Sequence, residues 1–280
     1  MTVEQMIEHI ISRCSAISKE EVSDRLELGR RKTGGFISDE VLLRMIAAEL
    51  GVEVHNGNGI SVLGLSAADL VPNLNSVTVV GRVVAVFSPK AFNGSRSGKF
   101  ASFLIADKSG LLRVVLWNDK TCLLESSGVK VGQVVRVLHG YTKEGRSGKV
   151  EVHVGAKAEI EMDPEGVDAN EFPDASKFTV KIGSISHTAG RVNIEGAVEC
   201  LGESSVFDRQ DSSVGKVLRF VLVDESGKLP VVVWNEKVDE LERMLVNGVG
   251  LRLVDVRVKK GLGEGVEAHV DSGTYAEFLF

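Results

Sequence analysis

The spacing of hydrophobic residues divides the chain into an N-terminal helical part and a longer part made of strands. Over roughly the first 50 residues, apolar side chains recur every three or four positions, which is the helical period. The pattern predicts three short amphipathic helices, at residues 3–11, 18–28 and 38–50, the last of them ended by Gly51. From residue 77 onward the period changes to two, which is typical of strands.

The strand-forming part repeats one order of elements. The first copy reads as strand 77–86, polar loop 88–99, hairpin 103–118, helix 119–125, strand 133–138, basic loop 140–148 and strand 149–154. The second reads as strand 191–198, loop 202–216, hairpin 220–235, helix 236–245, strand 250–258, loop 259–265 and strand 266–270. Strand, strand, strand, helix, strand, strand is the order of the OB-fold barrel.

The two hairpins have nearly the same sequence. Phe, Asp, Ser, Gly, Trp and Asn recur at a separation of 117 residues, from Phe103 and Phe220 to Asn118 and Asn235, and both tryptophans of the chain occupy the matching position. The shared Asp-x-Ser-Gly is a turn sequence, since Asp and Ser bond their own backbone and Gly accepts positive φ.

These patterns predict a mainly β protein with a small α domain: two tandem OB-fold β-barrels preceded by an N-terminal helical bundle. The expected domains are a helical bundle at 1–70, a first barrel at 73–162, an acidic linker at 163–177 and a second barrel at 178–280. The linker contains Pro164 and Pro173 and is expected to separate the barrels.

Charge distinguishes the two copies. The chain as a whole carries −6, but residues 73–162 hold 13 basic and 7 acidic side chains, a balance of +6, whereas residues 178–280 hold 12 and 16, a balance of −4. Residues 1–72 and 163–177 are each at −4. The local field governs binding to a polyanion, so the first barrel is the better candidate for nucleic-acid contact. The basic turn at residues 30–35 could touch phosphate, although cations at a helix C-terminus also complement its dipole.

Other functional classes find little support. Gly94, Gly98 and Lys99 resemble a phosphate loop only superficially, because the spacing is short and no Ser or Thr follows the Lys. The six histidines are never paired at ligand spacing, and no nucleophile elbow is present. We therefore expect no enzyme activity, no cofactor and no metal. The three scattered cysteines are expected to be buried and unpaired. Without a signal-like start or a membrane-length apolar run, the chain is expected in the cytoplasm, associated with the nucleoid.

The hairpin motif resembles a known family. The pattern from Gly98-Lys99 through Asp-x-Ser-Gly to Trp117-Asn118, repeated from Gly215-Lys216 to Trp234-Asn235, is similar to the DNA-binding OB domains of replication protein A. The N-terminal helical segment is similar to the start of archaeal, methanogen-type members. The resemblance implies that Trp117 and Trp234 stack on bases of single-stranded DNA.

The residues support the same role independently. Each Trp ends a strand beside a polar Asn, off the register of the core-facing residues, where it could present a flat face to a base; a core or rim aromatic is the alternative. Arg113 shares a strand face with Trp117, but Pro230 replaces it in the second copy, and the second stacking aromatic usual in the family is replaced near Val150 and Val266. The full set of candidate contacts is Trp117, Trp234, Arg113, Lys99, Lys216, Phe92, Arg96, Phe207, Arg209, Lys143, Arg146, Lys149, Arg257, Lys259 and Lys260.

The expected function is sequence-tolerant binding and protection of single-stranded DNA in replication, repair and recombination. Replication and repair proteins are expected partners of the N-terminal helices, together with other subunits of a replication protein A complex. Two alternatives stay open: a protein-interaction scaffold built on the barrels, and an RNA-binding protein.

Overall fold

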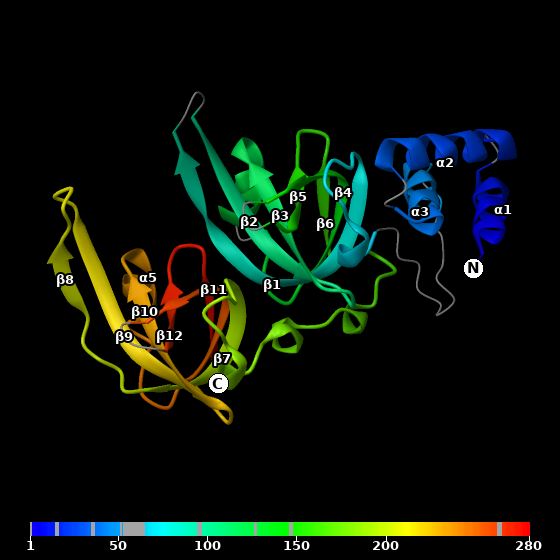
Figure 1. Cartoon of the computed structure of the whole chain (residues 1–280). Helices are drawn as coiled ribbons and strands as arrows, with labels where there is room; N and C mark the ends of the chain where they lie inside the picture. Colours follow the sequence, from blue (N-terminus) through cyan, green and yellow to red (C-terminus); the bar gives the residue numbers. More distant parts are fainter. Residues whose placement is uncertain are drawn as a thin grey trace. The chain divides into compact units, whose positions relative to one another are not determined.

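The computed structural model describes residues 2–14, 17–34, 37–50, 52, 65–93, 97–125, 128–145, 148–261 and 265–280. The chain splits into two compact units, Met1–Asp174 and Ala175–Phe280. Each unit is described by itself below. The helices, strands and their labels are drawn in Figure 1.

The predicted helices are confirmed, with one longer than expected. They are α1 (Val3–Arg13), α2 (Lys19–Thr33) and α3 (Asp39–Glu49). The second helix continues past the predicted end at residue 28 because its polar last turns extend to Gly34, which adopts the left-handed conformation at φ 60°. Its basic end is tied down: Arg30 donates to both carboxylate oxygens of Asp39 at 2.7 and 2.5 Å. The Arg30 hydrogen bond lowers the pKa of the Asp39 carboxyl.

The rest of the first unit is a closed β-barrel. Its strands are β1 (Val77–Phe92), β2 (Gly98–Ala106), β3 (Leu111–Trp117), β4 (Val134–Glu144), β5 (Val150–Val154) and β6 (Glu159–Met162). They are ordered β1-β2-β3-β5-β4-β6, and a β1–β4 pairing closes the cylinder. Two short helical segments, η2 (Asn118–Thr121) and α4 (Cys122–Glu125), lie between β3 and β4. This is the predicted OB-fold order.

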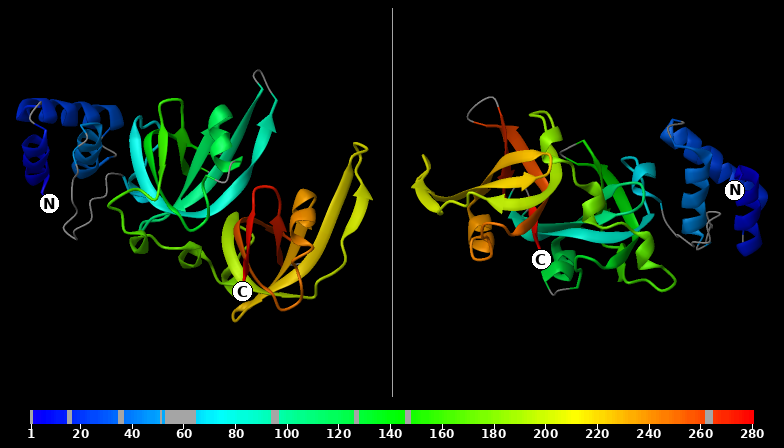
Figure 2. Two further views of the ribbon diagram at one scale, coloured as in Figure 1. Left: turned by 180° about the vertical axis from the view of Figure 1, so that it is seen from behind. Right: turned by 90° about the horizontal axis from the view of Figure 1, so that it is seen from below.

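The second unit has the same topology. Figure 2 draws the chain from two further directions. Its elements are β7 (Arg191–Glu199), β8 (Ser205–Asp208), β9 (Val214–Asp224), β10 (Gly227–Trp234), α5 (Glu236–Leu241), β11 (Gly250–Lys260), β12 (Val266–Val270) and β13 (Tyr275–Leu279). The path β10-β12-β11-β7-β9 is closed by a β9–β10 pairing. Each barrel has one matching parallel pair of strands, β3 with β5 in the first and β10 with β12 in the second.

Two segments predicted as loops are strands instead. β1 and β2 stay paired out to Phe92 and Gly98, and β8 pairs with β9 between residues 205 and 217. Each pair forms an arm that projects beyond its barrel (Figure 1). The loop prediction was wrong because an arm has no buried face at its tip, so the alternation of apolar and polar residues that marks a strand is absent there. The strands β6 and β13 were also missed.

The Asp-x-Ser-Gly turns have a second structural task. In the first barrel, Asp107 Oδ2 and Ser109 Oγ accept hydrogen bonds at 2.6 and 3.0 Å from backbone N–H groups of η1 (Ala67–Asp69), which precedes β1. In the second, Asp224 Oδ2 and Ser226 Oγ accept at 2.9 and 2.8 Å from N–H groups of η5 (Ile182–Ser184), which precedes β7. The repeated turn therefore fixes the entry of the chain into each barrel.

Part of the segment expected to act as a linker packs on the first barrel. Arg82 donates at 2.9 Å to the carbonyl of Phe172, and also to the carbonyl of Ala169 in η3 (Ala169–Glu171). The Phe172 ring is buried together with Val80 and Val134. This stretch therefore forms part of the first unit.

The structure also bears on the predicted cysteine burial and on the helices. Cys122 and Cys200 are exposed and Cys14 is half-buried, so the prediction of buried cysteines was wrong. Each cysteine lies at or just beyond the end of a helix or strand, where the hydrophobic pattern does not indicate which side chains are buried. Across the described ranges, none of the helices has the length and apolar character needed to cross a bilayer.

Candidate nucleic-acid interface

Trp117 lies on the outer face of the first barrel, at the end of β3. Its neighbours Val114 and Leu116 are fully buried in the core, so the alternation of the strand turns Trp117 outward. The ring is half-buried and pairs across the sheet with Phe100 of β2. The predicted outward register of this Trp is what the structure has.

Trp117 is part of a continuous group of rings. Phe92 of the arm meets it edge-on at 5.8 Å between ring centroids, and Phe100 lies tilted at 5.8 Å. On its other side His153 of β5 lies parallel at 5.8 Å, and Tyr141 of β4 follows His153 at 5.3 Å. We call Phe92, Phe100, Trp117, His153 and Tyr141 the first ring band.

Trp234 has a matching but shorter group in the second barrel. Phe207 of β8 meets it edge-on at 6.2 Å and His269 of β12 lies parallel at 5.8 Å. Arg209 lies over the Phe207 ring at 5.9 Å and donates to Asn235 Oδ1 at 2.6 Å. The predicted contacts Phe207, Arg209 and Trp234 are thus brought together. We call Phe207, Trp234 and His269 the second ring band.

Each Trp is held by the same hydrogen bond. The indole N–H of Trp117 donates to Nδ1 of His153 at 2.9 Å, and that of Trp234 donates to Nδ1 of His269 at 3.0 Å. An imidazole that accepts at Nδ1 carries its proton at Nε2. In the second barrel this Nε2 lies 2.7 Å from Glu267, and in the first the Nε2 of His153 lies 3.6 Å from Glu151. A Trp–His hydrogen bond therefore orients the indole in both barrels, and in the second barrel Glu267 extends it to a Trp–His–Glu chain, whereas Nε2 of His153 has no hydrogen-bond partner among the described residues.

The Asn and Gly residues of the repeated motif determine the backbone and the packing around each Trp. Asn118 and Asn235 adopt positive φ, 48° and 52°, which Asn tolerates better than most residues. Their side-chain oxygens accept from the backbone N–H groups of Lys99 and Lys216, both at 3.3 Å. The glycines before these lysines give space to the Phe rings of the arms: a Cβ at Gly98 would lie 2.6 Å from Phe92, and one at Gly215 would lie 2.4 Å from Phe207.

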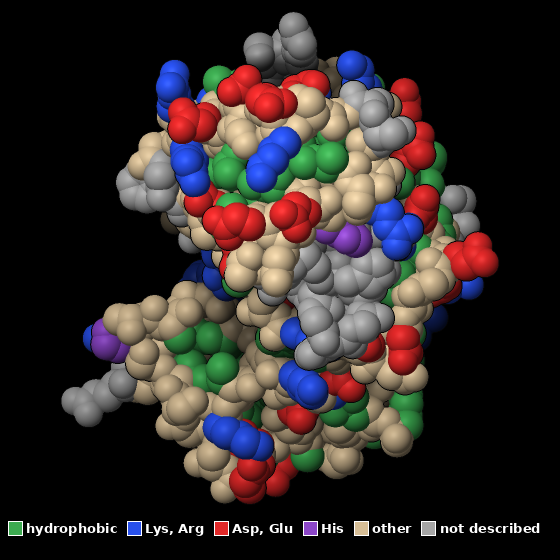
Figure 3. Space-filling view, turned by 90° about the vertical axis from the view of Figure 1, so that its right-hand side faces the viewer, with side chains coloured by type: hydrophobic (Ala, Val, Ile, Leu, Met, Phe, Trp, Pro, Cys, Tyr) green, Lys and Arg blue, Asp and Glu red, His purple; other side chains and the backbone are tan. Residues whose placement is uncertain are grey.

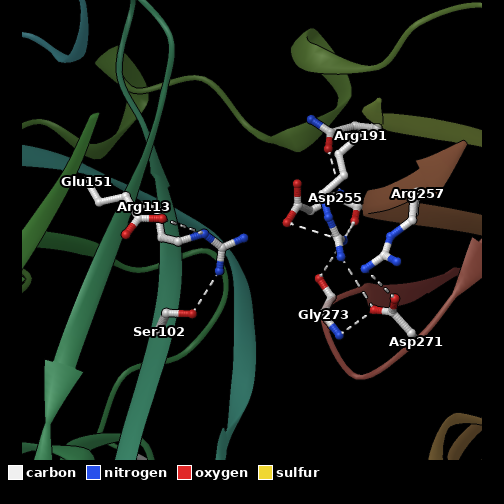
Figure 4. Close-up of polar contacts among 9 residues, drawn as sticks. Ser102, Arg113, Glu151, Arg191, Asp255, Arg257, Asp271 and Gly273 are labelled. Carbon is white, nitrogen blue, oxygen red and sulfur yellow. Dashed lines mark hydrogen bonds and ion pairs between the residues drawn. The ribbon is translucent and has the colours of Figure 1, made fainter. Parts of the chain in front are cut away.

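Arg113 is on the predicted face but is engaged within the barrel, as Figure 4 shows. It donates to Ser102 Oγ at 2.8 Å, lies 3.9 Å from Glu151 and covers the ring of Phe87 at 4.5 Å. Pro230, its counterpart, lies where the parallel pairing of β10 with β12 has not yet begun, since that pairing starts at Val231. The missing N–H of Pro230 therefore costs no ladder bond there.

Lys99 and Lys216 lie away from the tryptophans. Lys99 Nζ is 3.7 Å from Glu125 of α4, and Lys216 Nζ lies 2.8 Å from both Asp239 and Glu242. The hydrogen bond that Lys216 donates to Asp239, followed by the one it donates to Glu242, raises the pKa of the Lys216 ammonium above its ordinary value. The structure thus places these lysines on the helix side of β2 and β9.

The predicted cations in and beside the basic loops differ in whether an acidic side chain pairs with them. Lys143 is exposed and lies 5.3 Å from the centre of the Tyr141 ring, and Lys149, Lys259 and Lys260 are also exposed. Arg257 lies 3.3 Å from Asp271, which Arg191 also approaches at 3.6 Å (Figure 4). Arg96 and Arg146 lie outside the described residues.

The helical end of the first unit carries charges of both signs. In Figure 3, which looks onto this end, Lys and Arg side chains are interspersed with Asp and Glu among the described residues. The mixed pattern agrees with the acidic balance of residues 1–72. It gives this face no concentrated positive field.

Four rings of the two bands were not predicted from the sequence. They are Phe100, Tyr141, His153 and His269. A signal for the histidines was present: Val150-Glu151-Val152-His153-Val154 and residues 266–270 both read Val-Glu-x-His-Val. Tyr141 had no such repeat, because its counterpart on β11, paired with His269, is Arg257.

Comparisons with known proteins point to the same chemistry. A family model for an OB-fold nucleic acid binding domain matches residues 77–159, the first barrel. Replication factor A of Methanothermobacter thermautotrophicus is 27% identical over 236 residues, which is 81% of this chain and 29% of that protein. The chain therefore spans under a third of this relative.

A solved structure shares the fold. In a replication protein A heterotrimer bound to single-stranded DNA, one chain aligns with a TM-score of 0.54 and 17% identity, covering 80% of this chain and 51% of that one. This likeness concerns the fold. Taken with the sequence match across most of the chain, it confirms the predicted resemblance: the protein is similar to replication factor A, and it carries two tandem OB-fold barrels.

Proposed function

We propose that the protein binds single-stranded DNA with little dependence on sequence and protects it during replication, repair and recombination. One observation carries the proposal: each barrel presents an outward Trp that is oriented by a His at the matching position and flanked by a Phe on an arm. Every base has a π-face, so stacking on such a ring discriminates little between sequences.

The interface would combine stacking with cations. The rings of the two bands would stack on bases, and the exposed cations Lys143, Lys149, Lys259 and Lys260 would neutralise phosphates beside them. Arg209 would serve both purposes, since its guanidinium already lies over Phe207. Arg113 would act mainly by supporting the outer face, because Ser102, Glu151 and Phe87 engage it.

Partners and location follow from this ligand. Replication and repair proteins, and other subunits of a replication protein A complex, would dock away from the ring bands; the helices α1 to α3, with their mixed surface charge, are the proposed surface (Figure 3). The protein would act in the cytoplasm, at the nucleoid. The chemistry proposed here is binding alone, without catalysis.

RNA binding is the second candidate, favoured by one observation. The family model that matches residues 77–159 describes nucleic acid binding without restriction to DNA. Recognition that uses the 2′-hydroxyl prefers RNA. Competition between a labelled thymidine 30-mer and unlabelled ribo- and deoxyribo-oligomers of equal length separates the two.

Tryptophan fluorescence tests the proposed function directly. Binding of a thymidine oligomer should quench the emission of Trp117 and Trp234 and should weaken as salt is raised. A protein-interaction scaffold would show neither effect. Absence of quenching and of salt-dependent binding at micromolar oligomer would therefore refute single-strand binding.

A further inference from the structure

The second barrel carries on its outer face a cation that the sequence patterns did not single out. Arg219 lies in the middle of β9 between Leu218 and Phe220, which are 3% and 2% exposed in the core. The alternation of the strand therefore turns Arg219 to the opposite, outer face, where it is exposed. Its side chain has no hydrogen bond or ion pair with any described residue.

Arg219 lies beside the second ring band. In the β9–β10 register Arg219 faces Val232, and Val217 faces Trp234 two residues along. Diagonal neighbours of this kind are about 7–8 Å apart at the backbone, within the length of an Arg side chain. Val232 is in turn the parallel partner of His269. A row Arg219, Val232, His269 therefore crosses three strands next to the indole.

The first barrel has the same row with different chemistry. There Ser102 faces Val115, and Val115 is the parallel partner of His153. Ser102 is neutral and accepts the hydrogen bond of Arg113. In the second barrel the position of Arg113 is Pro230, and the position of Ser102 is Arg219. The outer-face cation of the first barrel is Arg113 on β3, whereas that of the second is Arg219 on β9, the counterpart of β2. Arg219 lacks the partners within the barrel that Arg113 has.

Two carboxylates of the same barrel are engaged by other cations or donors. Glu267 is held by His269 Nε2 at 2.7 Å, and Asp271 lies 3.3 Å from Arg257. Arg219 therefore keeps an exposed guanidinium with a free donor fork, which suits bidentate bonding to a phosphate. The net charge of −4 over residues 178–280 does not indicate this local positive group.

We propose that Arg219 binds a phosphate of the single strand next to the base that stacks on Trp234. This inference rests on the proposed function and assigns the salt-dependent contact of the second barrel. It also means that Pro230 does not leave that barrel without an outer-face cation.

Arg219→Gln in the full chain tests the proposal. The matched control is Arg243→Gln, which removes the same charge from an exposed position after α5 that has no partner among the described residues. Binding of a thymidine 30-mer is measured by tryptophan quenching over a range of salt concentrations. One lost phosphate contact should lower the slope of log K against log salt by about 0.7, which corresponds to about fivefold weaker binding at 0.1 M salt.

Two further arms make the result decisive. Arg243→Gln should keep the wild-type slope, and Arg219→Lys should keep most of it because the cation remains. Melting temperatures equal to wild type exclude a folding defect as the cause. An unchanged slope in Arg219→Gln, or an equal loss in Arg243→Gln, overturns the inference while leaving strand binding intact; a wild-type chain that does not bind overturns the proposed function and this inference with it.

Discussion

The indole of each Trp is half-buried, and this balance between packing and exposure decides what a mutation at the position does. His153 and Phe100 flank Trp117, but the core beneath is filled by Val114 and Leu116 from the same strand. The Trp was predictable from its motif. Its His partner also recurs, in the repeated Val-Glu-x-His-Val, but that repeat does not show that the His and the Trp meet. Only the three-dimensional pairing of β3 with β5 joins the two.

Trp117→Ala should weaken binding of a thymidine oligomer by about 1–3 kcal/mol, the stacking contribution of one base. The fold should survive, since the core residues remain. Fluorescence anisotropy with a labelled oligomer measures the affinity, and thermal unfolding serves as the control. A variant that unfolds, or one that binds as tightly as wild type, would mean that the ring is structural.

At the scale of elements, strands with one buried face were predictable and strands without one were not. The hairpins 103–118 and 220–235 were found because alternate residues enter the core, as at Phe103 and Phe220. β8 was missed because all four of its residues are exposed. The arms matter most for the proposed site, and they are the elements whose hydrophobic pattern is weakest.

Gly98→Ala tests the packing of the first arm. An added Cβ would lie 2.6 Å from both Phe92 and Asn118, so the arm ring and the residue after Trp117 must shift. We expect weaker oligomer binding, by up to the stacking contribution of about 1–3 kcal/mol. Gly110→Ala is the matched control in the same barrel, because a Cβ there meets nothing within 4 Å. Equal affinities of the two variants would contradict the packing argument.

The turn of the second barrel should make its stability depend on pH. Burial disfavours the charge of Asp224, but hydrogen bonds from Ser226, Ile182 and Gly227 together lower the pKa of this carboxyl below its ordinary value. A lowered folded pKa gives stability that is complete above the unfolded pKa of about 3.9 and is lost as pH falls through the folded value.

Asp224→Asn should remove this dependence. Compared with wild type, it should be less stable at pH 7, by about 1 kcal/mol or less because solvent screens this partly exposed carboxylate, and the difference should shrink below about pH 4. Urea unfolding at several pH values measures both effects. A difference that stays constant from pH 7 to pH 3 would show that the ionised carboxylate contributes nothing.

At the scale of the whole molecule, the helical segment and the first barrel carry opposite net charge, −4 for residues 1–72 against +6 for residues 73–162. The entry segment of the first barrel begins before β1, because Asp107 and Ser109 bond η1 and the N–H of Leu65 donates to the carbonyl of Thr78. A truncation that removes the helices should therefore end before residue 65.

Deleting residues 1–50 should leave most of the DNA affinity. The helices have an acidic balance, and none of the ring-band residues belongs to them. Oligomer affinity is compared with that of the full chain under identical salt. A loss of more than about tenfold, or about 1.4 kcal/mol, would show that the helical segment contacts the strand.

The two barrels should divide the strand unequally. The first barrel has a balance of +6 and a ring band that continues through His153 to Tyr141, whereas the second has −4 and ends its band at His269. A short oligomer that fills one barrel should therefore occupy the first. A long one engages both, and the second then gains from its high effective concentration beside the bound strand.

Oligomer length separates these contributions. With a thymidine oligomer of about 8 nucleotides, near the site size of one OB fold, Trp117→Ala should lose most of the affinity and Trp234→Ala little. With an oligomer of about 30 nucleotides both variants should lose affinity, because each removes one of two linked contacts. The length series is measured by anisotropy with labelled oligomers, so that loss of a fluorescent Trp does not affect the signal. Equal losses for the two variants on the short oligomer would refute the ranking of the barrels. The strand would then show no preference for the barrel of net charge +6 over the barrel of net charge −4.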